Sequence, residues 1–171
     1  RIIVKLRRFD RQIAIDRLSV TMEFDKDVGR LQRLMAASIA GINRRQAILE
    51  TLSINSGDRI IDVGCGAGQL LGHLAKAVGE HGEVIGLDPS ADQLAQAKSS
   101  CSDFSNITFL EKGADETGLP DDSCDAATST QALEYIPDVD AALAEITRVL
   151  RPGGSLVNIS ILWDHFRFHG A

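Results

Sequence analysis

The sequence predicts an α/β fold built on a doubly wound, mostly parallel β-sheet. From residue 59 onward, short apolar runs of strand length alternate with segments whose apolar residues recur at helical spacing. A glycine-rich turn follows the first apolar run and opens the first of these helices. Alternating strands and helices form βαβ units with right-handed crossovers, and such sheets bind ligands beyond the carboxyl ends of their strands. We therefore expect a functional site in the loops that follow the strands.

Five short apolar runs bounded by turn residues are the expected strands: residues 60–63, 84–87, 107–110, 124–129 and 155–162. A turn at residues 152–154 precedes the fifth strand, and the fourth strand is the weakest of the set. Helices are expected over residues 70–78 and 138–150, and a further helix is expected after Ser90, which can cap it.

The N-terminal part divides into two segments. Residues 22–52 are predicted to be helical, because their apolar residues form a stripe from Leu31 to Leu52. Residues 1–21 are an extension of uncertain role, which fits either a β-hairpin or extra sequence ahead of a natural start at Met22. Residues 53–171 form the expected main domain.

Length and composition are typical of a single soluble domain, with 171 residues, 44% hydrophobic and 25% charged. No apolar run approaches the roughly 20 residues that span a bilayer, so we expect a cytoplasmic protein without a membrane partner. The basic residues are spread out rather than clustered, so no nucleic-acid partner is expected. No disulfide framework or metal site is expected either, because no CxxC pair exists among Cys65, Cys101 and Cys124.

The segment Asp62-Val63-Gly64-Cys65-Gly66-Ala67-Gly68 joins the first strand to the first helix. Glycines allow a tight turn and a close approach to a ligand, and the helix N-terminus offers free N–H groups. Asp88 ends the second strand, 20 residues after Gly68, where a carboxylate can accept hydrogen bonds from both ribose hydroxyls of an adenosine. A nicotinamide-dependent reductase shares this arrangement, but its glycine spacing is GxGxxG rather than the GxGxG of this turn.

Five segments, in this order, resemble the motifs of class I S-adenosylmethionine-dependent methyltransferases of the ubiquinone/menaquinone-biosynthesis-like superfamily: residues 62–68, 84–90, 113–121, 131–138 and 150–154. The resemblance covers about residues 22–164. It implies a Rossmann-like fold, S-adenosylmethionine as the cofactor, methyl transfer to a small-molecule acceptor, and a cofactor-binding role for the main domain. The cofactor-binding residues that it implies are Asp62, Gly64, Cys65, Gly66, Gly68, Asp88, Pro89, Asp115, Glu116 and Gln131.

The resemblance also implies which part of the cofactor each residue meets. The backbone of Gly64, Cys65 and Gly66 would face the methionine part. Asp62 would order that loop or reach the amino group, and Gln131 would touch the methionine carboxylate or amine.

On the adenosine side, Asp88 would hold the ribose hydroxyls and Pro89 would pack on the adenine. Asp115 would accept a hydrogen bond from the adenine amino group, with Glu116 beside it. The sequence departs from the family pattern at Gln93, where a methionine commonly packs.

The implied reaction is an in-line displacement at a sulfonium methyl group, for which a protein mainly positions two reactants and excludes water. A base is needed only if the acceptor must lose a proton, and no catalytic residue is assigned, because no candidate sits in a recognisable dyad. The candidates are Glu134, Tyr135, Asp164 and His165. Either an apolar acceptor pocket or the core is expected to contain Trp163, Phe166 and Phe168.

Proteins of this class usually continue past the fifth strand, so the sheet is expected to be truncated there, with its C-terminal strands missing. A free strand edge predicts pairing, either with residues 1–21 or, as we favour, with a second copy in a homodimer. Two alternatives to a methyltransferase stay open. One is a catalytically silent cofactor-binding or dimerisation module, and the less favoured one is an NAD(P)-dependent reductase.

Overall fold

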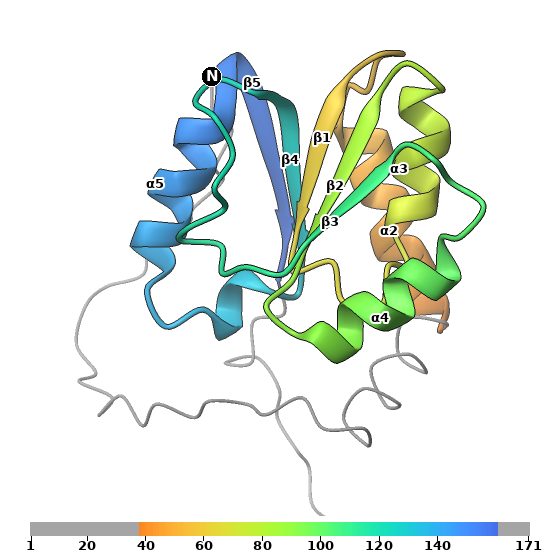
Figure 1. The fold of residues 1–171 in the computed structure, drawn as a ribbon, viewed down its shortest axis with the longest axis horizontal. Coiled ribbons are helices and arrows are strands. Elements are labelled where there is room, and N and C mark those ends of the chain that lie inside the picture. The colour runs from red at the N-terminus through yellow and green to blue at the C-terminus, as the bar shows by residue number, and fades with distance from the viewer. Residues whose placement is uncertain (1–37, 161–171) are drawn as a thin grey trace, which may run out of the picture.

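The computed structural model describes residues 38–160. They form one five-stranded sheet in the order β3-β2-β1-β4-β5, in which all neighbouring strands run parallel (Figure 1). The expected α/β, Rossmann-like parallel sheet is therefore confirmed. The strands are β1 (Arg59–Val63), β2 (Glu83–Leu87), β3 (Ile107–Leu110), β4 (Cys124–Thr130) and β5 (Leu150–Ile159).

Capping side chains precede the α-helices that begin at Ile39, Ala91 and Val139, but not the one that begins at Leu71. The Ser90 hydroxyl accepts a hydrogen bond from the Gln93 N–H at 3.4 Å, as expected, and Asp138 accepts one from the Ala141 N–H at 3.0 Å. Each cap satisfies an N–H group that has no partner within its own helix. The helical elements are α2 (Ile39–Thr51), α3 (Leu71–Val78), α4 (Ala91–Ser100), the 3-10 helix η1 (Leu133–Tyr135) and α5 (Val139–Val149).

Two apolar cores lie on the two faces of the sheet. Helices α2, α3 and α4 pack on the face that includes Ile60 and Val84, whereas α5 packs on the face that includes Ile61 and Ile85. Successive residues of one strand therefore enter opposite cores, because side chains alternate along a strand. Figure 1 shows α5 on one side of the sheet and the other three long helices on the opposite side. The sheet is thus doubly wound, and its strand order reverses between β1 and β4.

Helix α2 is the described part of the N-terminal segment that was expected to be helical. Ile48 and Leu52 of its apolar stripe are buried, but Ile39 is 78% exposed and Ile42 is 48% exposed. The expectations for residues 1–21 and 22–37 lie outside the described residues. Among residues 38–160, no helix has the length and apolarity needed to cross a membrane.

The start of the fifth strand differs from the sequence prediction. Strand β5 begins at Leu150 rather than at residue 155, so the expected turn at 152–154 lies within the strand. The pairing with β4 jumps from Cys124–Leu150 to Ala126–Ser155, and the extra residues form a bulge. The prediction was wrong because a local turn signal does not reveal that pairing already starts before the turn.

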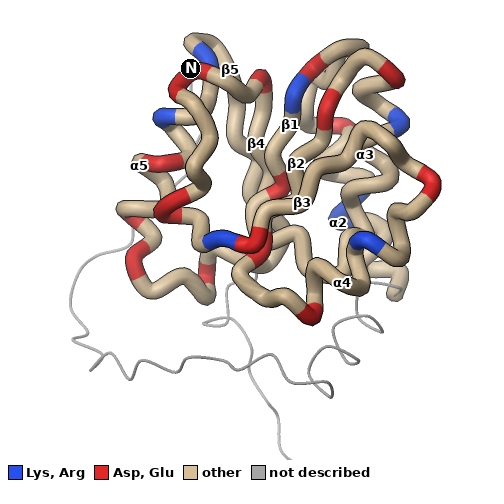
Figure 2. The backbone as a smooth tube through the Cα atoms, in the orientation of Figure 1, with Lys and Arg blue, Asp and Glu red and all other residues tan. Residues whose placement is uncertain are grey.

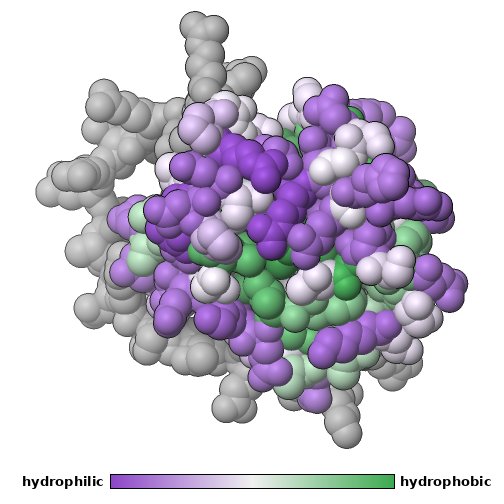
Figure 3. All heavy atoms as spheres, turned by 45° about the horizontal axis from the view of Figure 1, so that its top comes forward, coloured by the Kyte–Doolittle hydropathy of each residue, from purple (hydrophilic) through white to green (hydrophobic). Residues whose placement is uncertain are grey.

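Ion pairs join the amino ends of the strands. Arg59 at the start of β1 contacts Glu83 at the start of β2 at 2.7 Å, and Arg151 pairs with Asp125 of β4. Figure 3, in which this end of the molecule is turned forward, shows mainly hydrophilic residues there. The glycine-rich turn lies at the opposite, carboxyl end of the sheet, as the sequence predicts.

Candidate functional site

The glycine-rich loop after β1 is held against the end of β2. The N–H groups of Gly64 and Cys65 both donate to the Leu87 carbonyl, at 2.8 and 3.0 Å. Gly66 has a φ of +54°, and a side chain built on it would have no neighbour closer than the Gln93 amide oxygen at 4.0 Å. The loop therefore presents its backbone to open space at this glycine, and a ligand can approach the backbone closely there.

Asp88 ties this loop to the next one. Its carboxylate accepts one hydrogen bond from the Gly66 N–H and another from the Ser90 N–H, each at 2.9 Å. The side chain is buried, which raises the pKa of Asp88, while its two backbone N–H partners act in the opposite direction. Each carboxylate oxygen keeps a further lone pair, so Asp88 can still accept hydrogen bonds from a pair of hydroxyl groups.

Asp62 is a second buried carboxylate, near the end of β1. It is 3% exposed, and its carboxylate has no hydrogen-bond or ion-pair partner among residues 38–160. Burial, and secondarily the charge of Asp88, raises the pKa of Asp62 to about 7. An unpaired buried carboxylate is unfavourable in isolation, so this position favours a cationic ligand.

Acidic residues also predominate in the described chain as a whole. Figure 2 shows more Asp and Glu than Lys and Arg along the backbone between residues 38 and 160. This balance adds to the preference of the two buried carboxylates for a cation.

The sequence analysis missed a row of buried hydroxyls at the carboxyl end of β4. Within residues 38–160, the hydroxyl groups of Thr128, Ser129 and Thr130 have no hydrogen-bond partner, and Thr128 pairs in register with Asp62. The signal in the sequence that could have revealed this row is the run of three consecutive hydroxyl residues at the end of a buried strand. Buried polar groups are normally hydrogen-bonded, so the row marks this edge as a place for a polar ligand or ordered water.

Gln131 follows directly and has a φ of +54°, which is uncommon for a residue with a side chain. Its N–H donates to the Ile159 carbonyl at 2.7 Å, so the turn after β4 is fixed by β5. Backbone strain of this kind tends to collect at functional sites.

The remaining expected cofactor residues lie on neighbouring loops. Pro89, Asp115 and Glu116 are exposed, and the Asp115 carboxylate lies against Gly113. The structure therefore places Asp62, the glycine loop and Asp88 together at the carboxyl edge of the sheet, where the Gly66 N–H donates to Asp88, while Asp115 and Glu116 stand on the loop that follows β3.

The described base candidates are on or beside η1. Glu134 is partly buried, and burial, followed by the charge of Glu134, raises the pKa of Tyr135. Among the residues that the structure describes, no group of His, Cys, Asp and Glu could hold a metal ion. The candidates that lie outside residues 38–160 are Trp163, Asp164, His165, Phe166 and Phe168.

The three cysteines are buried free thiols, and burial raises the pKa of each. Such thiols stay protonated near neutral pH and behave as small apolar side chains. Cys65 therefore contributes its backbone N–H, rather than a reactive sulfur, to the glycine loop.

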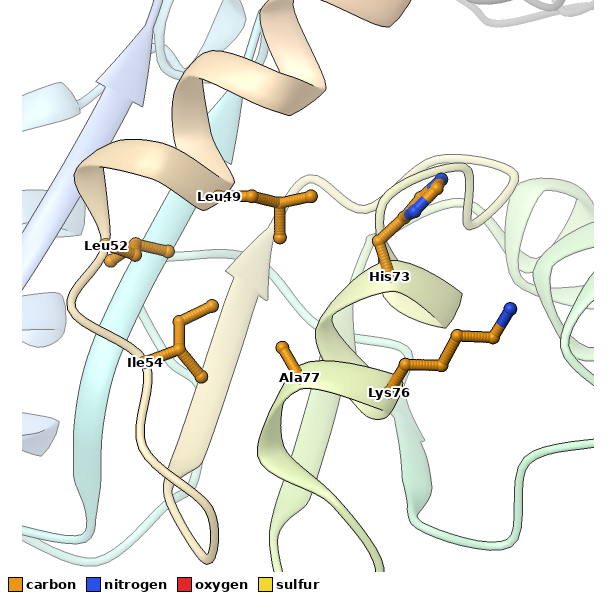
Figure 4. Close-up of a pocket in the computed structure, with 6 residues that line it drawn as sticks. All are labelled: Leu49, Leu52, Ile54, His73, Lys76 and Ala77. Atoms are coloured by element: carbon orange, nitrogen blue, oxygen red, sulfur yellow. The ribbon is translucent and has the colours of Figure 1, made fainter.

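A separate groove of about 440 Å³ lies between the C-terminal end of α2 and α3 (Figure 4). It contains none of the residues expected to bind a cofactor, and its polar side chains point outward from α3. Its lining residues are Leu49, Leu52, Ile54, His73, Lys76 and Ala77.

Comparison with known proteins finds a family match. The family model described as "Methyltransferase domain" matches residues 61–158, which include β1 through most of β5. The demethylmenaquinone methyltransferase of Staphylococcus saprophyticus is 36% identical over 113 residues, a stretch that covers 66% of this chain and 48% of that protein. The chain spans less than half the length of the curated relatives it matches first.

Solved structures agree on the fold. A SAM-dependent methyltransferase from Aquifex aeolicus superposes with a TM-score of 0.72 at 23% identity, over 86% of this chain and 79% of that one. The [4+2]-cyclase SpnF superposes with a TM-score of 0.63 at 32% identity, over 68% of this chain and 43% of that one.

Proposed function

The chain belongs to the methyltransferase domain family, and we propose that it catalyses S-adenosylmethionine-dependent methyl transfer to a small-molecule acceptor. The observation that carries this proposal is the hydrogen bond from the Gly66 N–H to Asp88 at the carboxyl edge of the sheet. It joins a backbone that a ligand can approach to a carboxylate that can accept from ribose hydroxyls.

The cofactor of such a domain is S-adenosylmethionine, and the described residues fit its chemistry. The cofactor carries a sulfonium and an ammonium, and Asp62 is a buried carboxylate that lacks a partner within residues 38–160. Its ribose offers two neighbouring hydroxyls, and Asp88 has acceptor capacity left after its two backbone hydrogen bonds.

We propose the following roles for the methionine half of the site. The backbone of Gly64, Cys65 and Gly66 lines the methionine part, with Gly68 completing the turn. Asp62 and Gln131 meet its charged end. Support comes from the positive φ angles of Gly64, Gly66 and Gly68 and from the fixed turn at Gln131.

For the adenosine half, we propose that Asp88 binds the ribose and that Pro89 packs on the adenine. Asp115 accepts from the adenine amino group, with Glu116 as its neighbour. The position of these residues on the loops after β2 and β3 supports the assignment, because ligands of such sheets bind beyond the carboxyl ends of the strands.

The bound cofactor supplies an activated methyl group, so the protein's task is positioning. The loop after β1 and Asp88 would hold the methyl donor in the orientation that in-line transfer to the acceptor requires. Asp62, when ionised, would balance the positive charge of the bound cofactor. No base is assigned, because one is needed only if the acceptor must lose a proton.

A function other than methyl transfer stays open as a second hypothesis, because the similar protein SpnF is a [4+2]-cyclase. That protein's activity does not transfer to this chain. The likeness does show that proteins of this fold are not confined to one reaction. Cofactor binding and methyl transfer are therefore measured separately.

We also propose that the protein forms a homodimer through the outer edge of β5. Within the described residues, β5 pairs with β4 alone and stands at the end of the strand order. Unpaired backbone groups at a strand edge favour pairing with another strand.

Calorimetric titration tests the proposed function. S-adenosylmethionine, S-adenosylhomocysteine and NAD are titrated separately into the folded chain, and we expect heat from the first two and none from NAD. Absence of binding by both sulfur compounds would contradict the proposal. Transfer is then followed as formation of S-adenosylhomocysteine with a panel of small acceptors, in which binding without any turnover would favour the silent module.

A further inference from the structure

The connection between β3 and β4 crosses one face of the sheet without a helix of its own. Residues 111–123 are turns and irregular chain, although Thr117 in their midst is only 1% exposed. Buried irregular backbone requires hydrogen-bond partners from elsewhere. Here those partners come from α5.

Glu145 of α5 accepts two hydrogen bonds from the loop, both from Thr117. One of its carboxylate oxygens, Oε1, accepts from the Thr117 N–H at 2.9 Å and from the Thr117 hydroxyl at 2.6 Å. The same hydroxyl accepts from the Leu119 N–H at 3.2 Å, so the Thr117 side chain links Glu145 to the loop backbone two residues further on.

Arg148, one turn further along α5, completes the anchor. It donates to Glu145 at 2.7 and 2.8 Å and to the Leu119 carbonyl at 2.8 Å, and it pairs with Asp121. The hydrogen bonds from Arg148, and next those from Thr117, lower the pKa of Glu145 to about 2. Glu145 is therefore ionised throughout the neutral range, which strengthens its hydrogen bonds to the loop.

This anchor begins one residue after Glu116. The part of the loop that precedes Asp115 is also fixed. The loop leaves β3 at Leu110, whose carbonyl accepts from the Asp88 N–H at 3.1 Å. Ala114 is buried in the core under α5. The exposed pair Asp115 and Glu116 is thus held between two fixed points.

We propose that Glu145 and Thr117 are positioning residues that set the Asp115 loop and thereby select adenine over other bases. This inference rests on the proposed function, because it assumes that S-adenosylmethionine binds at this edge. A group held within a fraction of an ångström discriminates between ligands, whereas the same group on a loose loop does not.

The test compares S-adenosylhomocysteine with S-inosylhomocysteine, in which an oxygen replaces the adenine amino group. In the wild-type chain, we expect the adenine compound to bind about tenfold more tightly, since a hydrogen bond to a carboxylate is lost in the other compound. We expect Thr117→Val and Glu145→Ala to bring this ratio close to one, and Thr117→Ser to restore it.

The chain contains a matched control at the amino end of the sheet. Glu83 there accepts from the Thr108 hydroxyl at 2.9 Å and pairs with Arg59 at 2.7 Å, which repeats the Thr–Glu–Arg arrangement. Thr108→Val and Glu83→Ala remove the same kind of contact away from the Asp115 loop and should leave the base preference unchanged, so a loss of preference confined to the Thr117 and Glu145 variants indicates positioning.

The outcomes are distinguishable. No binding of S-adenosylhomocysteine by the folded wild type overturns the proposed function and this inference together. Binding without a base preference in the wild type, or an undiminished preference in Thr117→Val, overturns this inference alone. If Glu145→Ala does not fold, the isosteric Thr117→Val and its serine counterpart decide the matter.

Discussion

The carboxylate of Asp88 accepts a hydrogen bond from the backbone N–H of Gly66 at 2.9 Å, which links the end of β2 to the loop after β1. Asp88 also holds the start of α4 through the Ser90 N–H. One side chain thus sets the relative position of two loops that the proposed cofactor would bridge.

Replacing Asp88 by alanine should weaken S-adenosylhomocysteine binding about 10- to 100-fold, because the ribose hydroxyls and the Gly66 N–H lose their acceptor. Calorimetry on the wild type and the variant measures the change. Asp125→Ala is a matched control, since Asp125 accepts from the Arg59 N–H at 2.8 Å at the other end of the sheet. Equal affinity of the wild type and Asp88→Ala for S-adenosylhomocysteine would contradict the assignment of Asp88 to the ribose.

The ligand-free protein should lose stability as the pH rises from 5 to 8. The pKa of Asp62 is about 7 in the folded chain, against an ordinary value of 3.8, so the folded state holds a proton that the unfolded chain has released. The free energy of unfolding therefore falls over this range, by roughly 3 kcal/mol. Urea denaturation at several pH values should show a flatter profile for Asp62→Asn, and identical profiles for both proteins would contradict the raised pKa.

Cofactor binding should show the opposite trend with pH. An ionised Asp62 attracts the cationic cofactor, so affinity should rise as the pH increases through about 7. At a pH below about 7, binding should release a proton from Asp62. Titrations in two buffers of different ionisation enthalpy measure that proton. A proton count that is the same in the wild type and Asp62→Asn would show that another group is responsible.

Gly66→Ala should abolish cofactor binding with only a modest loss of stability. The φ of +54° makes a side chain costly by roughly 1–2 kcal/mol, but the new Cβ meets no atom within 4 Å except the Gln93 amide oxygen at that limit. This Cβ would instead occupy space that the proposed cofactor needs. Gly153→Ala carries the same kind of strain at a φ of +89°, with nothing within 4 Å, and should leave binding intact.

Sedimentation at several concentrations tests the β5 edge. We expect a reversible monomer–dimer equilibrium in the full chain, because the described edge of β5 offers unpaired backbone groups. A monomer at every concentration, both with and without residues 1–21, would show that this edge needs no second copy.

The sequence predicted the elements whose signals are local. Strands β1 to β3 and the cap at Ser90 follow from apolar runs, turn residues and a hydroxyl at the right position. The start of β5 was missed because Leu150 pairs with Cys124, which lies far away in the sequence.

The same distinction holds in the site. The position of the glycine loop and of Asp88 at the carboxyl edge of the sheet could be predicted, since each directly follows a strand that the sequence indicates. The anchor between Thr117 and Glu145 could not, because these residues are separated by 28 positions and meet only after the sheet has formed. The raised pKa of Asp62 is likewise a consequence of burial that no residue pattern reveals.

The helix-free connection between β3 and β4 also has a kinetic consequence. A helix protects its amides through a ladder of internal bonds, whereas the backbone of this connection is retained by a few contacts, among them those with the side chains and main chain of α5. Breaking that small network opens the segment while the sheet stays intact, so its amides should exchange with solvent by local unfolding, far below the free energy of global unfolding. On the proposed assignment of Asp115 to the adenine, the residence time of the cofactor should therefore depend on the contacts that α5 makes with this loop.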